Sequence, residues 1–402
     1  MCSISGGTKW DKIAETIFTQ SRDRGRDSSG LYRLSPTGLW VANHRATPTT
    51  EVISPSEEQP VGDKIKLVFN GIISNDEELG VQEGEADTSV LPRVLDFSSL
   101  LNFKDSISKI IGSYAIACIV EKEIWLAANY KPIWIAEKDN NWYFSSLKNH
   151  FPKQIIPYKM PPYSVQNLID HNSTLELPRK QSKKAIVICS SGLDSTSVAS
   201  YACFKHGPEN VTLLHFNYGC KATNQEIKSI RKIQSYLKCD LKILPMSSFG
   251  SSTLLEKNAT FAEAKEGAEY AHEWVPARNL LMLSTSVAYA EAKNYGHIYL
   301  GTNLEEAGAY PDNEEQFILD FSNLLYGAVQ NGIKIEIHTP LGGLMKHEII
   351  PFGLKYNTPY HLTWSCYDNK KHHCGKCGPC FMRKTAFERN GLVDPVKYEE
   401  TK

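Results

Sequence analysis

The chain begins MCSISGG, with a cysteine directly after the initiator methionine. Removal of Met1 would leave the Cys2 thiol beside a free α-amine. A thiol that has an amine as its own general base is a nucleophile suited to attack on an amide carbonyl. A small residue at position 2 is also ordinary in proteins without such chemistry. Whether Cys2 is catalytic therefore has to be judged from motifs elsewhere in the chain.

Four further cysteines cluster near the C-terminus, in the segment SCYDNKKHHCGKCGPC, where seven, two and two residues separate them. Four thiolates at this spacing predict a closed tetrahedral Zn²⁺ site with a structural role, because no coordination position stays open. An iron–sulfur cluster uses the same donors and remains an alternative. We expect the neighbouring His372 and His373 to face solvent. The candidate ligands are Cys366, Cys374, Cys377 and Cys380.

A third candidate site is the segment SSGLDST at 190–196, which follows the short apolar run KAIVICS. A serine- and glycine-rich turn between a buried strand and a helix can hold anionic oxygens with its backbone N–H groups and the helix dipole. A Walker loop is excluded, because the lysine of GKS or GKT is missing. The turn predicts phosphate binding, and a turn without a ligand is the alternative.

The composition is typical of a globular protein without a strongly charged surface. The 402 residues include 41% hydrophobic and 22% charged residues, with a formal net charge of −1. This balance argues against a broadly basic nucleic-acid surface. We find neither a run of about 18 apolar residues nor a signal-peptide pattern, so we expect no membrane association. Scattered cysteines beside one metal-type cluster indicate a reducing, cytoplasmic setting.

Two domains are predicted, 1–175 and 176–402. The first contains short β-type runs separated by turn residues, as in an antiparallel sheet, with helical patterns at 9–20 and 76–96. In the second, strand-like and helical segments alternate, which predicts a doubly wound parallel sheet. The strand-like runs are LYRLS, GLWVAN, IKLVFNG, SYAIACIVE, EIWLAAN and NWYFSS in the first domain, and KAIVICS and VTLLHFNYG in the second.

The first domain resembles the glutaminase domain of class II, N-terminal-nucleophile glutamine amidotransferases. The motifs MCSISGG, RGRDSSG, HRATPT, FNGIISNDEEL, ADTSVL, GSYAIA and YFSS follow in that family's order over roughly residues 2–165. The resemblance implies an αββα fold in which Cys2 attacks glutamine. It also implies an oxyanion hole at Asn70 and Gly71, with Arg45 on the substrate carboxylate and Asp87 on its ammonium group. Ala46 stands where the family often has an aromatic residue.

The loop SSGLDST resembles the SGGxDS pyrophosphate loop of N-type ATP pyrophosphatases, with a serine in place of the first glycine. This implies that the loop holds the pyrophosphate of ATP and that Asp194 also acts through Mg²⁺. The implied ATP-binding residues are Ser190, Ser191, Gly192, Leu193, Asp194, Ser195 and Thr196.

Residues 184–399 resemble the 7-cyano-7-deazaguanine synthase family, through LLHFNYG, WVPARN, YLGTNLEE, GAYPDNEEQF, PLGGLMKHEII and the cysteine-rich end. The resemblance implies contacts to the nucleotide or base from Arg278, Asn279 and Asp312. Three segments depart from the family: NYGCKATNQE replaces DYGQ and the basic residues after it, WVPARN replaces VPGRN, and Pro311-Asp312-Asn313 replaces PDC.

Together the two resemblances imply a fused enzyme that adenylates the carboxylate of 7-carboxy-7-deazaguanine and adds ammonia released from glutamine at Cys2. The products would be the 7-amido and 7-cyano compounds. Two alternatives stay open: conversion of a nitrile to a formamidine on nucleic acid, as in archaeosine-type pathways, and attachment of a deazaguanine to a protein N-terminus in anti-phage defence. The expected partners are ATP, glutamine or ammonia, and a 7-deazaguanine substrate, and we expect a homo-oligomer.

Overall fold

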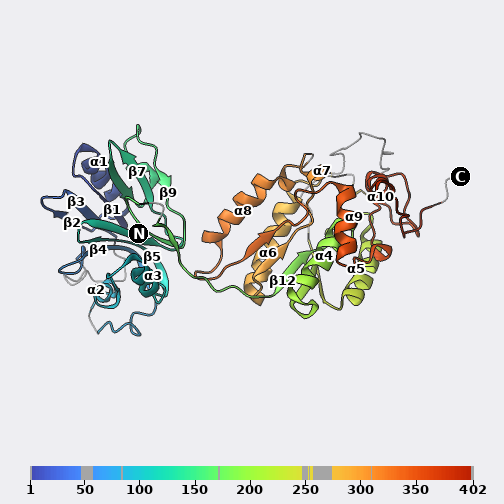
Figure 1. The fold of residues 1–402 in the computed structure, drawn as a ribbon, viewed down its shortest axis with the longest axis horizontal. Coiled ribbons are helices and arrows are strands. Elements are labelled where there is room, and N and C mark those ends of the chain that lie inside the picture. The colour runs from blue at the N-terminus through green and yellow to red at the C-terminus, as the bar shows by residue number, and fades with distance from the viewer. Residues whose placement is uncertain are drawn as a thin grey trace. The chain divides into compact units, whose positions relative to one another are not determined.

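The computed structural model describes residues 2–46, 58–82, 85–170, 173–246, 252, 254–256, 274–308 and 310–399. The chain divides into two compact units, Met1–Arg179 and Lys180–Lys402 (Figure 1). Each unit has its own hydrophobic core.

Unit 1 contains two antiparallel sheets packed face to face. The first sheet has the strand order β2-β3-β1-β8-β7-β9 and the second β11-β10-β6-β5-β4. Ile4 and Val41 of the first sheet pack against Val68 and Ala117 of the second in one buried cluster. The strands are β1 Ser3–Gly7, β2 Ser28–Leu34, β3 Leu39–Arg45, β4 Lys66–Ile73, β5 Gly112–Val120, β6 Glu123–Ala128, β7 Trp134–Lys138, β8 Asn141–Ser145, β9 Tyr158–Lys159, β10 Ser164–Asn167 and β11 Leu175–Glu176.

Helices cover the outer face of each sheet, as Figure 1 shows. Helix α1 (Lys12–Ser21) buries Ala14 and Ile17 against the first sheet. Its N-terminus is capped by the Asp11 carboxylate, which accepts hydrogen bonds from the backbone N–H groups of residues 13 and 14 at 2.9 and 3.1 Å. On the other side, α3 (Leu100–Ile107) packs on the second sheet, and α2 (Leu91–Val94) packs against the 3-10 helix Asp87–Val90, which contacts β4. The layer order is therefore αββα, as expected.

Unit 2 is built on a parallel five-stranded sheet with the order β14-β13-β12-β15-β16. The chain starts in the centre, runs outward through β13 and β14, and returns to the other side of β12 with β15. The order thus reverses between β12 and β15, which is the position where doubly wound sheets bind ligands. The strands are β12 Ala185–Ile188, β13 Val211–Asn217, β14 Asp240–Pro245, β15 His297–Tyr299 and β16 Glu336–His338.

The alternation of side chains along β12 divides the core of unit 2 into two clusters. Ala185 and Val187 face the cluster that contains α4 and α9, whereas Ile186 and Ile188 face α6 and α8. Both faces of the sheet are therefore covered, as a parallel sheet requires. The helices are α4 Leu193–His206, α5 Thr223–Leu237, α6 Arg278–Lys293, α7 Leu304–Ala307, α8 Glu315–Ala328, α9 Lys346–Lys355 and α10 Gly378–Arg389.

Every strand-like run named from the sequence forms a strand, and the helical pattern at 9–20 becomes α1. The expected helix over 76–96 is mostly wrong: residues 76–80 form turns, and among the described residues of this segment helical structure is confined to the 3-10 helix Asp87–Val90 and to α2. The proline and glycine-rich surroundings of this segment explain the short helices. Part of the HRATPT motif, residues 47–49, lies outside the described residues.

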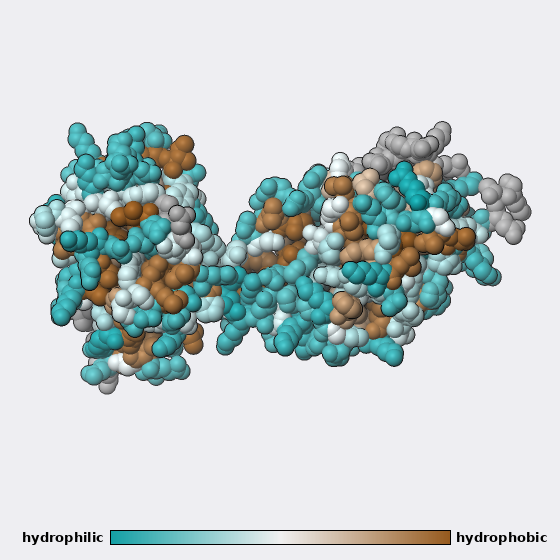
Figure 2. All heavy atoms as spheres, in the orientation of Figure 1, coloured by the Kyte–Doolittle hydropathy of each residue, from teal (hydrophilic) through white to brown (hydrophobic). Residues whose placement is uncertain are grey.

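The visible face in Figure 2 is mostly hydrophilic, with several patches of apolar residues on both units. Apolar atoms contribute more than half of the surface of an ordinary folded protein, so such patches are expected. Within the described ranges, none of the helices has the length and hydropathy needed to cross a membrane.

Candidate functional site

Side chains alternate between the two faces of a β-sheet, and this alternation places the predicted residues of unit 1 on the faces between its two sheets. Cys2 has the same parity as Ile4, which points between the two sheets. Arg45 has the same parity as Val41 on β3, and Asn70 the same as Val68 on β4. Because β1 pairs with β3 with Ser3 opposite His44, the Cys2 position lies beside that of Arg45.

The segments that carry Cys2 and Asn70 are held together by buried amides. The Asn43 side chain donates hydrogen bonds to the carbonyl oxygens of Ser3 and Phe69, at 3.3 and 2.9 Å. Asn70 Nδ2 lies 3.5 Å from Ser146 Oγ, a hydroxyl that also accepts a hydrogen bond from the backbone N–H of Ile4. The residue after Cys2 and the residue before Asn70 thus share one bridging amide.

Gly71 has a steric reason to be glycine. A Cβ atom at this position would lie 1.8 Å from the carbonyl oxygen of Ser113 on the neighbouring strand β5. A side chain here would force β4 and β5 apart. The tight pairing fixes the backbone beside Asn70, which is the position of the expected oxyanion hole.

Asp87 lies against the end of β4, where its Oδ2 atom accepts a hydrogen bond from the Ile73 N–H at 3.1 Å. Burial raises the pKa of Asp87, and the positive charge of Arg45 opposes that rise. These two residues are therefore near enough to interact through their charges. The Cys2 thiol itself is partly buried, with Sγ 3.9 Å from the Ala46 carbonyl oxygen.

Two features of unit 1 were not predicted. Burial and the charge of Arg24 lower the pKa of Lys131, while the negative form of Cys2 acts in the opposite direction. In addition, the RGRDSSG segment and the neighbouring α1 border a cleft of about 380 Å³. The cleft is lined by Phe18, Thr19, Arg22, Arg26, Asp27, Ser28, Ser29 and His44.

In unit 2, the predicted phosphate loop connects β12 to the N-terminus of α4 at the reversal point of the sheet. The Ser195 hydroxyl accepts a hydrogen bond from the Ser190 N–H at 3.2 Å and lies 3.1 Å from the Ser190 hydroxyl. Gly301, after β15, packs so closely that a Cβ there would lie 3.0 Å from the Ser195 backbone nitrogen. The loop and the helix start are therefore tightly held.

Ser191, which stands where the ATP pyrophosphatase motif has its first glycine, has a φ of 71°. This left-handed conformation is costly for an L-residue, so the loop keeps the backbone path of a glycine despite the substitution. The same holds for Ala277, which replaces the glycine of VPGRN and has a φ of 53°. Both residues that stand in place of a motif glycine therefore have a left-handed backbone conformation.

A pocket of about 220 Å³ opens beside the loop. Its walls include the loop, the start of α6, the segment after β15 and the segment before the cysteine cluster. These four segments are far apart in the sequence. The residues that line the pocket include Ser190, Gly192, Leu193, Asp194, Ser195, Tyr218, Glu226, Arg278, Asn279, Glu306 and Lys346.

Asp194 is the charged centre of this pocket. Its Oδ2 atom accepts hydrogen bonds from Lys346 Nζ and, at 3.2 Å, from Asn303 Nδ2. Burial raises the pKa of Asp194, and the Lys346 charge opposes that rise. Lys346 also lies 3.5 Å from Glu306. Lys346, Asn303 and Glu306 were not predicted, although each follows a parallel strand at the carboxyl edge, where ligand-binding residues are expected.

Arg278 and Asn279 form the start of α6. The Arg278 guanidinium lies over the Tyr218 ring at 5.9 Å and 3.5 Å from the Tyr218 hydroxyl. Asp312 caps this helix by accepting a hydrogen bond from the Asn279 N–H at 2.9 Å. Asp312 does not line this pocket itself. Its role in the structure is to position Asn279 through that hydrogen bond.

The structure separates the predicted loop residues into two groups. Ser190, Gly192, Leu193, Asp194 and Ser195 line the pocket. The Ser191 and Thr196 side chains are fully buried, and neither hydroxyl has a hydrogen-bond partner among the described residues. These two residues can therefore contribute to the site through their backbone.

The departing NYGCKATNQE segment places Cys220 and Glu226 beside the pocket. Burial raises the pKa of Glu226 to about 7, and its Oε2 atom lies 3.5 Å from the Cys220 sulfur. Burial also raises the pKa of Cys220 to about 12. The thiol is accordingly protonated at neutral pH and acts as a small packing group.

The four cysteines near the C-terminus converge as predicted, with their sulfur atoms within 4.8 Å of one another. The Cys374–Cys380 and Cys366–Cys377 sulfur separations are 3.9 and 4.0 Å, close to the roughly 3.8 Å expected for thiolates around a tetrahedral Zn²⁺. Backbone N–H groups of Asp368 and Cys374 donate to the Cys366 sulfur at 3.3 Å. The donor set fits a metal ion.

One expectation near this centre is wrong. His373 is buried, with 3% of its surface exposed, and its ring packs 4.3 Å from that of Trp364. Its Nε2 atom accepts a hydrogen bond from the Ser365 N–H at 3.1 Å. His373 therefore supports the cysteine-bearing loop from inside, while His372 is partly exposed.

A parallel sheet with a phosphate loop at its reversal point, beside a four-cysteine centre, defines unit 2 as an ATP-dependent ligase of the pyrophosphate-loop class. A family model described as "Queuosine biosynthesis protein QueC" matches residues 184–391. The chain belongs to the 7-cyano-7-deazaguanine synthase family.

Relatives of two lengths support this assignment. The 7-cyano-7-deazaguanine synthase of Sulfolobus acidocaldarius is 39% identical, with 99% of this chain and 100% of that protein covered. The synthase of Saccharolobus solfataricus is 38% identical, with 100% of this chain and 100% of that protein covered. The Aliarcobacter butzleri synthase is 36% identical over 54% of this chain and 96% of its own length.

Proposed function

We propose that the protein adenylates the carboxylate of 7-carboxy-7-deazaguanine and adds ammonia to it, giving the 7-amido and then the 7-cyano product. The observation that carries this proposal is the pocket at the sheet reversal, where a phosphate loop, Asp194 and Lys346 meet. The full-length synthase relatives support the substrate class.

Each chemical step follows from the poor reactivity of a carboxylate. A carboxylate oxygen attacks the α-phosphorus of ATP, releasing pyrophosphate and leaving an acyl-adenylate. Ammonia then attacks the acyl carbon, and AMP leaves with the electron pair of the broken C–O bond. The oxygen of the resulting amide then attacks the α-phosphorus of a second ATP and releases pyrophosphate, and loss of AMP and protons gives the nitrile.

The loop residues have separate roles in this scheme. The N–H groups of 190–196 and the α4 dipole hold the leaving pyrophosphate, and Lys346 neutralises its charge. Asp194 Oδ1 is buried without a hydrogen-bond partner among the described residues, so it fits a cation accompanying ATP. Mg²⁺ held there would supply further charge neutralisation. Arg278 and Asn279 line the same pocket and contact the nucleotide or base.

The proposed source of ammonia is glutamine hydrolysed in unit 1. Cys2 attacks the side-chain amide, and its α-amine, freed by removal of Met1, transfers the proton to the leaving ammonia. Asn70 and the Gly71 N–H bind the oxyanion, while Arg45 and Asp87 hold the amino-acid end. The bridge from Asn43 to Ser3 and Phe69 supports this assignment by fixing the two segments. Zn²⁺ at the four cysteines is structural.

Labelled glutamine tests both halves at once. Purified protein receives Mg²⁺-ATP, 7-carboxy-7-deazaguanine and glutamine carrying ¹⁵N in its amide, and mass spectrometry follows the products. We expect label in the amide and nitrile, its loss in Cys2→Ala, and unlabelled product when ammonium is added to that variant. Cys118→Ala, which removes a buried thiol from the same unit, serves as control. AMP without nitrogen incorporation would refute the proposed acceptor and direct the search to a protein or nucleic acid.

A further inference from the structure

Two histidines and a glutamate converge at the edge of the parallel sheet in unit 2, apart from the cysteine cluster and the nucleotide pocket. His297 begins β15, and Glu336 and His338 begin and end β16. His297 lies directly opposite Glu336 in the parallel register, and Tyr299 opposite His338. The alternation of side chains therefore places His297, Glu336 and His338 on one face of the sheet.

The three donor atoms are close enough to bind one metal ion. His297 Nδ1 and His338 Nε2 share a hydrogen bond of 3.0 Å, which a bound ion would replace. Glu336 Oε2 lies 3.6 Å from His297 Nδ1 and 3.7 Å from His338 Nε2. Ligands about 2.1 Å from a tetrahedral ion are separated from one another by roughly 3.4 Å. Only small movements would bring all three atoms to a common centre.

The surrounding side chains fix the orientation of the two imidazoles. The Tyr299 ring stacks on His338, with centroids 4.6 Å apart and planes 22° apart. The His206 ring packs 4.7 Å from His297. His206 is itself engaged through both nitrogens, with the Lys183 carbonyl oxygen at 3.0 Å and the Tyr299 hydroxyl at 2.8 Å. It therefore supports the cluster and is not a fourth donor.

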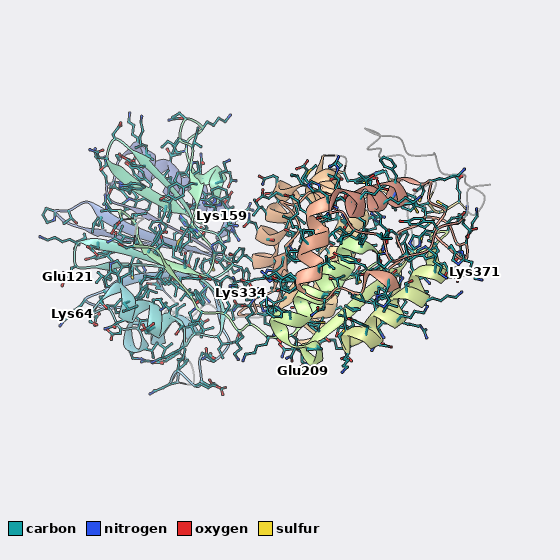
Figure 3. The ribbon with its side chains drawn as sticks, turned by 45° about the vertical axis from the view of Figure 1, so that its right-hand side comes forward. Lys64, Glu121, Lys159, Glu209, Lys334 and Lys371 are labelled. Carbon is teal, nitrogen blue, oxygen red and sulfur yellow. The ribbon has the colours of Figure 1, made fainter. Side chains whose placement is uncertain are left out.

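The glutamate is also held in place. Its Oε1 atom lies 2.6 Å from Lys334 Nζ, and its Oε2 atom accepts a hydrogen bond from Gln181 Nε2 at 2.8 Å. Lys334, labelled in Figure 3, precedes β16 by two residues. The Lys334 ammonium occupies the oxygen that points away from the histidines. It weakens the attraction of the carboxylate for a second cation. The Oε2 atom near the imidazoles accepts one hydrogen bond, from Gln181, and keeps a second lone pair for a metal ion.

We propose that His297, Glu336 and His338 bind a second divalent transition-metal ion of the Zn²⁺ class. Two imidazoles and one carboxylate oxygen suit such ions. The ion would tie β15 to the edge strand β16. Since residues 300–302, directly after β15, line the nucleotide pocket, this link would also steady that wall of the pocket. The proposal is independent of which acceptor the enzyme uses.

Metal stoichiometry tests the proposal on the full-length protein. After loading with Zn²⁺ and removal of free metal, elemental analysis should find two ions per chain in the wild type. His297→Gln and His338→Gln should each retain one, and His361→Gln, which removes a histidine outside the cluster, should retain two. One ion per wild-type chain, or two in both cluster variants, would overturn the proposal.

Two further readouts keep the test decisive if a histidine variant folds poorly. With Co²⁺, the wild-type spectrum minus that of His338→Gln should contain visible ligand-field bands without thiolate charge transfer, because this site has no sulfur donor. Lys334→Met should bind Zn²⁺ several-fold more tightly at this site, because the competing cation is gone. Unchanged affinity in Lys334→Met, with unchanged Co²⁺ spectra in His338→Gln, would contradict the assignment.

Discussion

The guanidinium of Arg383 donates two parallel hydrogen bonds to the Asp394 carboxylate, from Nε at 2.8 Å and from Nη2 at 2.9 Å. Arg383 is fully buried and Asp394 nearly so. The same guanidinium binds the Tyr360 carbonyl oxygen and the Thr363 hydroxyl. One side chain thus joins α10, the C-terminal loop and the segment that leads to the cysteine cluster.

We predict that Asp394→Ala lowers the free energy of unfolding by about 3–5 kcal/mol, because it leaves a buried guanidinium without its counter-ion. Urea denaturation measures the change, and Glu388→Ala on the exposed face of α10 is the matched control. Burial alone would raise the pKa of Asp394. The hydrogen bonds from Arg383 and Tyr398 outweigh this effect and hold the pKa below its usual range. This stabilisation exists above the unfolded-state pKa and is lost in acid, so the penalty should shrink as pH falls.

A second prediction concerns Glu226, whose pKa burial raises from 4.5 to about 7. Between pH 4.5 and about pH 7, the Glu226 carboxyl is ionised in the unfolded chain but protonated in the folded protein. The free energy of unfolding therefore falls as the pH rises through this range and levels off above pH 7. Glu226→Gln removes this loss. We expect it to be more stable than the wild type at pH 8, by at most about 3 kcal/mol, and equal to it near pH 4.

Urea denaturation from pH 4 to pH 8 tests this, with Glu209→Gln as the control at an exposed carboxylate (Figure 3). The control should follow the wild-type curve. Parallel curves for Glu226→Gln and the wild type would show that the carboxyl is ionised in the folded protein.

The third prediction concerns Lys346 in the nucleotide pocket. Lys346→Met removes the cation that pairs with Asp194 and should slow pyrophosphate release on the order of 100-fold. Lys355→Met, at the other end of α9, should leave the rate unchanged. Pyrophosphate release with ammonium as nitrogen source measures this step without unit 1. A normal rate in a folded, zinc-replete Lys346→Met would exclude a role in phosphate binding.

The strands and the metal centre could be predicted from sequence because their signals are local, whereas the αββα layer order of unit 1 came from the family resemblance. Alternating residues give the strands of unit 1, and closely spaced cysteines give the ligands near the C-terminus. Asn43 and Lys346 were missed because their roles arise from contacts across 26 and 152 residues of chain. Nothing in the neighbouring sequence marks an amide that bridges two strands, or a lysine that reaches another helix.

The fold could be predicted more completely than the side-chain arrangement of the site. A motif fixes backbone conformation more firmly than it fixes which side chains face the ligand. The loop 190–196 shows this, because Ser195 lines the pocket while the adjacent Thr196 is buried beneath it.

The last prediction concerns Ala277, which precedes α6 with φ 53° and ψ 28°. An alanine in this left-handed conformation costs about 1 kcal/mol relative to glycine, since its Cβ crowds the backbone. Ala277→Gly should therefore stabilise unit 2 by about that amount, whereas Ala290→Gly inside the same helix should destabilise it by at least about 1 kcal/mol. Chemical denaturation of the two variants compares the same substitution in opposite backbone contexts. Because Ala277 directly precedes Arg278 and Asn279, pyrophosphate release should be measured on the same samples. Destabilisation by Ala277→Gly would mean that the methyl group makes a packing contribution larger than the strain it causes.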